Sequence, residues 1–357
     1  MSGVSDLMGE ISILLYVYNC GSFLKDSLDS LINQSFQDFE IFCIDDDSDD
    51  NSLEILMEYS KKHARIRYIS INHLGFSKAM NEALNSIKSK YVYIMKPSTC
   101  LKPTALEILF KQAEKNNVDM IFTDINYQYD TLYYNKSDSI NQIQDNVNKQ
   151  VFDYKELKNL LFAIDPSLEN KFYRLDFIKN QQIKFFNDLI YPEHLFFYNS
   201  LLRAKKISFL NEFLFEYIKP FEFLKIDEIK IKNIFKEYNL ILDMFREFNE
   251  FDNYKNNFLE LKLSFFLREY SRIPEDYQEY FFNILKNDLI GEFLSDEFED
   301  TSLEFLSKFN RKLFEQIIIS ENIYEFKLLR KNLFMTNEFN TIVDRKSFLK
   351  SIGKVID

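Results

Sequence analysis

Glycine, cysteine, histidine and tryptophan are scarce in this chain of 357 residues, and the shortages exclude several kinds of site. Its six glycines never form G-x-x-x-x-G-K-[ST] or G-x-G-x-x-G, so neither of these phosphate-binding loops is present. The three histidines and three cysteines lack the paired spacing of zinc sites. Cys20, Cys43 and Cys100 are odd in number and widely separated, which fits a reducing compartment better than a disulfide framework.

Basic residues are outnumbered, since 44 Lys and Arg against 56 Asp and Glu give a net charge of −12. This charge disfavours broad binding to nucleic acid or anionic lipid. No apolar run approaches the ~20 residues that span a bilayer. The N-terminal segment has Asp6 and Glu10 but no basic residue before Lys25, unlike a secretory signal. We therefore expect a cytoplasmic protein with no nucleic-acid partner and no transmembrane segment.

Residues 11–125 alternate between two hydrophobic periods. Continuous apolar runs are typical of strands covered on both faces, and the segments between them place apolar residues on one helix face. The expected strands are 11–18, 39–44, 65–71, 91–95 and 118–123, and the expected helices are 23–32, 53–59, 76–87 and 103–113. The alternation predicts an α/β fold with a mostly parallel sheet flanked by helices. Ligands bind such sheets at the carboxyl ends of the strands, which here follow Tyr18, Ile44, Ile71 and Met95.

The pattern changes in the second half of the chain. Residues 127–150 are polar without a clear period and predict a loop, and short mixed elements follow over 152–220. Beyond about residue 225, apolar residues recur at helical spacing with few Pro or Gly interruptions. We expect two domains, an α/β domain over 1–220 and a helical region over 221–357.

Short motifs stand at and between the predicted strand ends. They are Leu15–Asn19 (LYVYN), Ser30–Phe36 (SLINQSF), Ile44–Ser52 (IDDDSDDNS), Asn72–Asn81 (NHLGFSKAMN), Glu169–Phe177 (ENKFYRLDF) and Tyr191–Phe196 (YPEHLF). In this order and spacing they resemble the family 2 glycosyltransferases of the GT-A fold. That family's motifs read P-V-Y-N, S-L-x-N-Q-T-x, V-D-D-G-S-x-D-x-S, N-x-G-x-S-x-A-R-N, W-N-K-L-Y-R-R-x-F and E-D-x-x-F. The resemblance covers about residues 10–220.

The resemblance implies a GT-A-type domain that moves a sugar from a nucleotide-sugar donor, with inversion at the anomeric carbon, to a glycan or lipid-linked acceptor. It implies a role in assembling a cell-surface polysaccharide or glycoconjugate. Peripheral association with the inner face of the membrane stays open, although the pair Lys205–Lys206 is too small for an anchor. Aromatic residues of the polar segment are candidates for acceptor contact: Tyr127, Tyr129, Tyr133 and Tyr134.

Asp45 and Asp46 match the aspartates that hold the nucleoside in the family, and Tyr18 and Asn19 end the first strand beside that position. A carboxylate at a strand end can accept hydrogen bonds from a base or from ribose hydroxyls, each worth roughly 1.5–3 kcal/mol. The following acidic residues 47–51 have a simpler interpretation. Asp50 or Asn51 would cap the next helix, where a negative charge is stabilised.

The sequence departs from the family where a D-x-D motif normally binds Mg²⁺ or Mn²⁺. Lys96 and Ser98 replace its two aspartates, so we expect no divalent-metal cofactor. Tyr16 replaces the usual proline and Met80 the usual arginine. His194 replaces the aspartate of E-D, which is the usual general base.

Two hypotheses follow from these departures. In the first, the chain is a metal-independent glycosyltransferase in which Lys96 and Ser98 contact the donor and Glu193 or His194 is the general base. In the second, it is a non-catalytic GT-A-like scaffold that binds a nucleotide, a glycan or a partner glycosyltransferase, with the C-terminal helices as the partner face. A nucleotidyltransferase is less well supported, because metal-binding carboxylates and a glycine-rich loop are missing.

Overall fold

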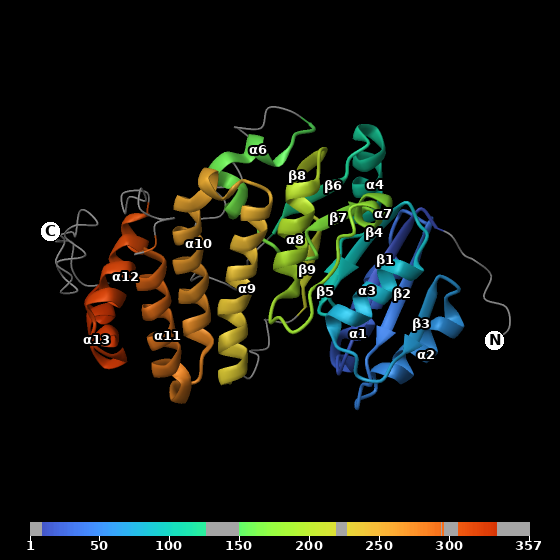
Figure 1. Ribbon diagram of the computed structural model, residues 1–357. Helices are drawn as coiled ribbons and strands as arrows, with labels where there is room; N and C mark the ends of the chain where they lie inside the picture. The colour runs from blue at the N-terminus through green and yellow to red at the C-terminus, as the bar shows by residue number, and fades with distance from the viewer. Residues whose placement is uncertain (1–8, 126–149, 219–226, 294, 296–305, 334–357) are drawn as a thin grey trace. The chain divides into compact units, whose positions relative to one another are not determined.

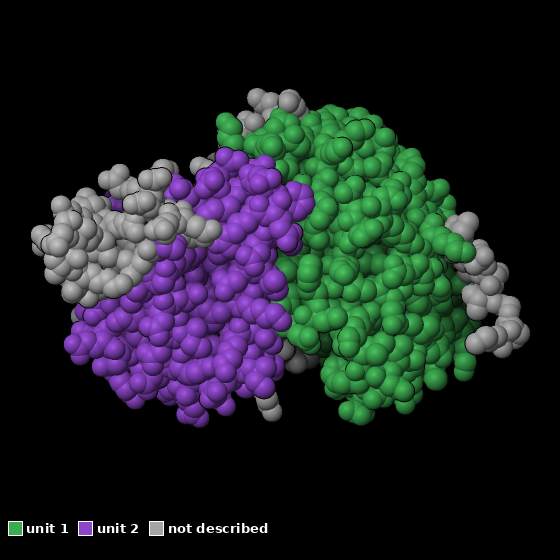
Figure 2. Space-filling model, in the orientation of Figure 1, with its two compact units in different colours: residues 1–222 green, residues 223–357 purple. Residues whose placement is uncertain are grey.

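The continuous apolar runs form buried strands in the computed structural model, which describes residues 9–125, 150–218, 227–293, 295 and 306–333. Every residue of the strand Phe39–Asp45 is buried, as expected for a strand with helices on both of its faces. The chain divides into two compact units, residues 1–222 and 223–357 (Figure 2). The predicted boundary and the four tyrosines Tyr127, Tyr129, Tyr133 and Tyr134 lie outside the described residues.

A seven-stranded sheet forms the centre of the first unit (Figure 1). Its order is β3-β2-β1-β4-β7-β6-β8, and only β7 runs antiparallel to its neighbours. A separate antiparallel pair joins β5 to β9. The strands are β1 (Ile11–Val17), β2 (Phe39–Asp45), β3 (Ile66–Ser70), β4 (Tyr91–Met95), β5 (Thr99–Leu101), β6 (Met120–Asp124), β7 (Lys171–Arg174), β8 (Ile207–Phe213) and β9 (Phe215–Tyr217). The predicted α/β fold with a mostly parallel sheet is confirmed.

Helices connect the strands of this unit. They are α1 (Gly21–Ile32), α2 (Ser52–Lys62), α3 (Phe76–Ser86), α4 (Ala105–Asn116), α6 (Tyr154–Leu157), the 3-10 helix η1 (Lys158–Ala163), α7 (Leu175–Asn180) and α8 (Pro192–Arg203). Apolar residues of α1, α2 and α4 share one core with alternate residues of β1, β2 and β4. The buried residues of α3 are not part of that core, although α3 packs on β1 and β2. Helices therefore cover both faces of the sheet.

The second unit is helical in its described residues. Its helices are α9 (Glu228–Glu247), α10 (Phe251–Arg272), α11 (Glu275–Phe293), α12 (Lys308–Ile319) and α13 (Ile323–Leu333). The predicted helical C-terminal region is confirmed for these residues. In its interior, Lys262 forms ion pairs with Asp288 and Glu292, which offset the cost of burying its charge. Among the described helices, none is both long and apolar enough to cross a bilayer.

The predicted helix starts in the first half of the chain are accurate to within about two residues. The helix expected from Pro103 begins at Ala105, because Lys102–Thr104 form the turn that leaves β5; there the Lys102 amide donates to the Leu214 carbonyl. Asn51 occupies the N-cap position of α2, but its side chain makes no capping bond. Asp50 instead accepts from the amides of Ser52 and Gly21, so it joins the starts of α1 and α2.

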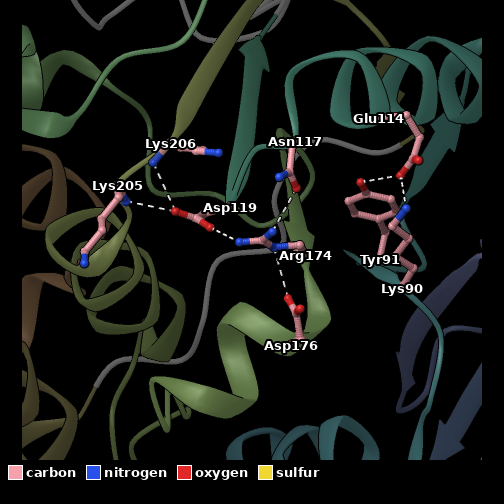
Figure 3. Close-up of polar contacts among 9 residues, drawn as sticks. All are labelled: Lys90, Tyr91, Glu114, Asn117, Asp119, Arg174, Asp176, Lys205 and Lys206. Carbon is pink, nitrogen blue, oxygen red and sulfur yellow. Dashed lines mark hydrogen bonds and ion pairs between the residues drawn. The ribbon is translucent and has the colours of Figure 1, made fainter.

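A buried carboxylate joins three neighbouring strands at one end of the sheet (Figure 3). Asp119, just before β6, pairs with the guanidinium of Arg174 at the end of β7, and its other oxygen accepts from the amides of Lys205 and Lys206 before β8, at 2.9 and 3.0 Å. The side chain of Asp119 is 9% exposed, whereas that of Asp176, 3.0 Å from the same guanidinium, is 67% exposed. Asp119 therefore fixes the register of β6, β7 and β8.

Replacing Asp119 by Asn should loosen this end of the sheet. The amide group cannot accept from both the guanidinium and the two backbone amides, and an unsatisfied buried group costs about 1–3 kcal/mol. We expect the free energy of local opening, measured by hydrogen exchange in β6 and β7, to fall by about that amount.

The matched control is Asp176→Asn, which removes an exposed partner of the same arginine. Its expected effect is below about 0.5 kcal/mol, as is usual for exposed ion pairs. Equal losses in the two variants would contradict the register role of Asp119.

Candidate active site

The loops that follow β1 and β2 are joined by side chain to backbone bonds. Asn19 has a left-handed backbone with φ 49°, and its amide donates to the Ser48 hydroxyl at 3.1 Å. Its side-chain oxygen accepts from the Asp49 amide at 2.8 Å. Tyr18 is 41% exposed and lies edge-on to the ring of His73. Tyr18 and Asn19, which are predicted to bind the nucleotide, therefore lie just after the carboxyl end of β1. Asn19 joins the two loops, and Tyr18 leaves part of its ring exposed.

Asp46 is completely buried and accepts three hydrogen bonds. They come from the hydroxyl of Tyr16 at 2.7 Å and from the amides of Leu74 and Gly75 at 2.7 and 2.8 Å. Gly75 has φ 80°, a conformation that favours glycine, and it is the residue that precedes α3. Burial raises the pKa of Tyr16, and the hydrogen bond to Asp46 raises it further. Asp46 thus fixes the segment before α3, and the tyrosine that replaces the family's proline covers its carboxylate.

Asp45 is also buried, but only half of its carboxylate is bonded. Its Oδ2 accepts from the Ser70 hydroxyl at 3.2 Å, and its Oδ1 has no hydrogen-bond partner among the described residues. A buried acceptor without a donor is costly, so this oxygen is suited to accept from a ligand. The two aspartates that sequence reasoning assigned to one role therefore differ in the structure.

Lys96 and Glu193 form an ion pair between the end of β4 and the first turn of α8. The ammonium Nζ lies 2.9 Å from Oε1 of Glu193, and the two side chains are 28% and 10% exposed. Burial alone lowers the pKa of Lys96, but the charges of Glu193 and Glu169 outweigh it and raise this pKa. Burial would raise the pKa of Glu193, but Lys96 and His194 lower it below its ordinary value of 4.5. At neutral pH both groups are charged.

Glu169 is a site residue that the sequence analysis missed. It is 1% exposed, and neither carboxylate oxygen has a hydrogen-bond partner among the described residues. Burial raises its pKa, which Lys96 partly counteracts. The hydroxyl of Tyr93 donates to its backbone carbonyl and so holds this segment against β4. The signal was available, because Glu169 occupies the tryptophan position of the family's W-N-K motif.

The two remaining predicted site residues make different contacts. The ring of His194 stacks on Tyr191 with centroids 5.1 Å apart, and the residue is 9% exposed. Ser98 lies in the turn before β5, where its carbonyl accepts from the Ile218 amide at 2.8 Å. The charge of His194 lowers the pKa of Glu193. Ser98 makes its bond to Ile218 through its backbone.

The residues at the D-x-D position do not fit a divalent cation. Such ions require oxygen ligands, whereas Lys96 brings an ammonium that is paired with the nearby carboxylate of Glu193. Within the part of the chain that the structure describes, no three His, Cys, Asp or Glu residues gather as a metal site. That the protein works without a metal stays a prediction.

A known protein family matches the part of the chain that contains the candidate site. The model of glycosyl transferase family 2 matches residues 12–198, which contain the whole site described above. The chain belongs to glycosyl transferase family 2.

Related sequences match only part of this family 2 chain. The cholesterol galactosyltransferase of Borreliella burgdorferi is 26% identical over 216 residues, which are 58% of this chain and 59% of that protein. The poly(ribitol-phosphate) beta-glucosyltransferase of Bacillus spizizenii is 27% identical over 216 residues, which are 58% of this chain and 32% of that protein. The matched region thus spans one third to three fifths of these two relatives.

A solved structure extends the likeness of fold along almost the whole chain. TarS 1–349 of S. aureus matches with a TM-score of 0.66 at 18% identity, over 94% of this chain and 95% of that one. Its complex with UDP-GlcNAc also matches with a TM-score of 0.66, at 17% identity. At this identity the likeness confirms the GT-A fold of this family 2 chain.

Glu193 and Glu169 should influence stability with opposite dependence on pH. The lowered pKa of Glu193 gives stability that is present above pH 4.5 and lost as the pH falls through its folded pKa. The raised pKa of Glu169 gives stability that is present below pH 4.5 and lost as the pH rises through its folded pKa. Relative to wild type, Glu193→Gln should therefore become less stable, and Glu169→Gln more stable, as the pH rises.

The measurement is urea unfolding of both variants and wild type between about pH 3.5 and 8, where each unit of pKa displacement corresponds to ~1.4 kcal/mol. Parallel profiles for the two variants would contradict the assignment of opposite shifts.

Proposed function

We propose that this protein is a metal-independent, inverting glycosyltransferase that uses a nucleotide-sugar donor. The observation that carries the proposal is the ion pair of Lys96 and Glu193. It puts a cation where family enzymes hold a metal ion, and a carboxylate beside it at the position of the family's E-D motif. A cation can stabilise the charge that develops on a departing diphosphate, and a carboxylate can take the proton of an acceptor hydroxyl.

The donor's nucleoside would bind at the ends of β1 and β2. The unpartnered Oδ1 of Asp45 would accept from the base or ribose, Tyr18 offers a partly exposed ring, and Asn19 and Asp46 hold the loops around them. Ser98 would contact the donor beside Lys96. Glu193 is the general base that this geometry favours, with His194 as the other candidate. Each of these assignments is part of the proposal.

The proposed acceptor is a growing cell-surface polysaccharide or glycoconjugate. Support comes from the relatives, which are named for a ribitol-phosphate polymer and for cholesterol, the first an anionic polymer and the second a membrane lipid. The proposed place of action is the cytoplasm, including the inner face of the membrane.

A second candidate function, a non-catalytic scaffold, is favoured by two contacts. Tyr16 and two backbone amides already occupy Asp46, and Glu193 already neutralises Lys96. In this alternative the polar groups of the site stabilise the fold instead of binding a donor.

Thermal unfolding with UDP, GDP or ADP in the presence of EDTA separates the two candidates. A nucleotide at about 100 times its Kd should stabilise the protein by ~2.7 kcal/mol and raise the melting temperature without any divalent metal. Asp45→Asn and Asp46→Asn should each abolish the shift, because both remove a strand-end carboxylate.

Glu40→Gln is the matched control, because Glu40 is a buried carboxylate of the same strand β2 at its other end, paired with Arg67. It should keep the nucleotide-induced shift. No shift with any nucleotide would favour the scaffold, and a shift that appears only with Mn²⁺ would contradict metal independence.

A further inference from the structure

Lys96, the cation at the D-x-D position, has no surplus positive charge with which to attract a diphosphate. Its single positive charge is matched by Glu193 at 2.9 Å, and the buried carboxyl group of Glu169 also acts on it. A donor diphosphate brings further negative charge into the same place. Either the lysine keeps its present partner and the diphosphate is repelled, or the lysine changes partner.

The accessibility of the pair favours a change of partner. The side chain of Lys96 is 28% exposed and that of Glu193 is 10% exposed, so the lysine is the more accessible partner of the pair. A lysine ammonium is a point charge on a flexible four-carbon stem, and it can redirect its donors without moving the backbone. Glu193 is less able to follow, because α8 begins with Pro192 and buries every residue from Pro192 to Leu202.

On the basis of the proposed function, we infer that the ammonium of Lys96 leaves Glu193 for the diphosphate when the donor binds. This movement frees Glu193 to act as the base only when a donor is present. In the free protein the same contact keeps Glu193 ionised and weakly basic. Once the ammonium has moved, Glu193 and Glu169 remain together in a buried place without their shared cation. Glu169, whose pKa burial already raises, then takes up a proton from solvent, which offsets the repulsion and leaves Glu193 ionised as the base, so donor binding is coupled to proton uptake.

The charged groups that act on Lys96 are Glu193 of α8, Glu169 before β7 and Asp165 after η1. Around these carboxylates, His194 acts on Glu193, Glu169 acts on Tyr93 of β4 and on Tyr217 of β9, and the buried ammonium of Lys171 donates to the Asp165 carbonyl. Asp165 accepts from the amide and the hydroxyl of Ser167. Burial raises the pKa of both tyrosines far above neutrality, so they stay uncharged. Glu193 and Glu169 are the groups whose environment changes most when the ammonium moves.

The test is isothermal titration calorimetry of the wild type and variants at pH 7, in EDTA and in two buffers of different ionisation enthalpy. The titrant is whichever of UDP, GDP or ADP binds most tightly. Glu193→Gln should tighten nucleotide binding by about threefold to tenfold, because the nucleotide no longer competes with a carboxylate for the lysine. Wild type should take up a fraction of a proton per nucleotide, up to about one, and Glu169→Gln distinctly less. Lys96→Met should weaken binding at least tenfold, and the control Glu40→Gln should match wild type in both readouts.

The outcomes separate the two proposals. Nucleotide binding that Glu193→Gln leaves unchanged or weakens overturns the exchange of partners and leaves the proposed function standing. Binding enthalpies that do not depend on the buffer in wild type also overturn the exchange. Failure of all three nucleotides to bind either wild type or Glu193→Gln overturns the exchange and the proposed function together.

Discussion

The ion pair of Lys96 and Glu193 is the interaction on which the proposed chemistry of this protein depends. Burying two charges is costly unless they are close together, and the 2.9 Å contact meets that condition at the end of β4. The same contact sets the charge of both partners, because each holds the other in its ionised form. It also joins two parts of the chain almost one hundred residues apart, so the site exists only in the folded domain.

The polar groups at the strand ends divide into those that hold the loops and those that remain available. Asn19 and Asp46 are engaged by backbone amides of neighbouring loops, which orders these loops before any ligand arrives. Asp45 and Glu169 are buried and have carboxylate oxygens without a hydrogen-bond partner in the part of the chain that the structure describes, a state that costs free energy. Buried acceptors of this kind are what a ligand rich in hydroxyl and N–H donors can satisfy, which is why they support a binding role.

Three of the departures from the family pattern make polar interactions in the structure. Tyr16 replaces a proline and bonds to Asp46, while Lys96 replaces an aspartate and pairs with Glu193. Glu169 replaces a tryptophan and adds a carboxyl group whose charge acts on that lysine. Tyr16 and Lys96 have thus each acquired a polar partner at a strand end, Asp46 and Glu193 respectively.

The sequence alone determined the class of fold and the family, and it predicted the approximate position of the site. Hydrophobic periodicity is local, and the order of motifs along the chain survives without coordinates, so the sheet, its strands and the residues at strand ends could be read in advance. The start of α4 was less accurate, because the turn before it depends on a bond to a distant segment, from the Lys102 amide to the Leu214 carbonyl. Only the tertiary structure decided that Asp45 and Asp46 differ, that Glu193 pairs with Lys96, and that Glu169 lies beside them, because these facts depend on burial and on contacts between segments far apart in the chain.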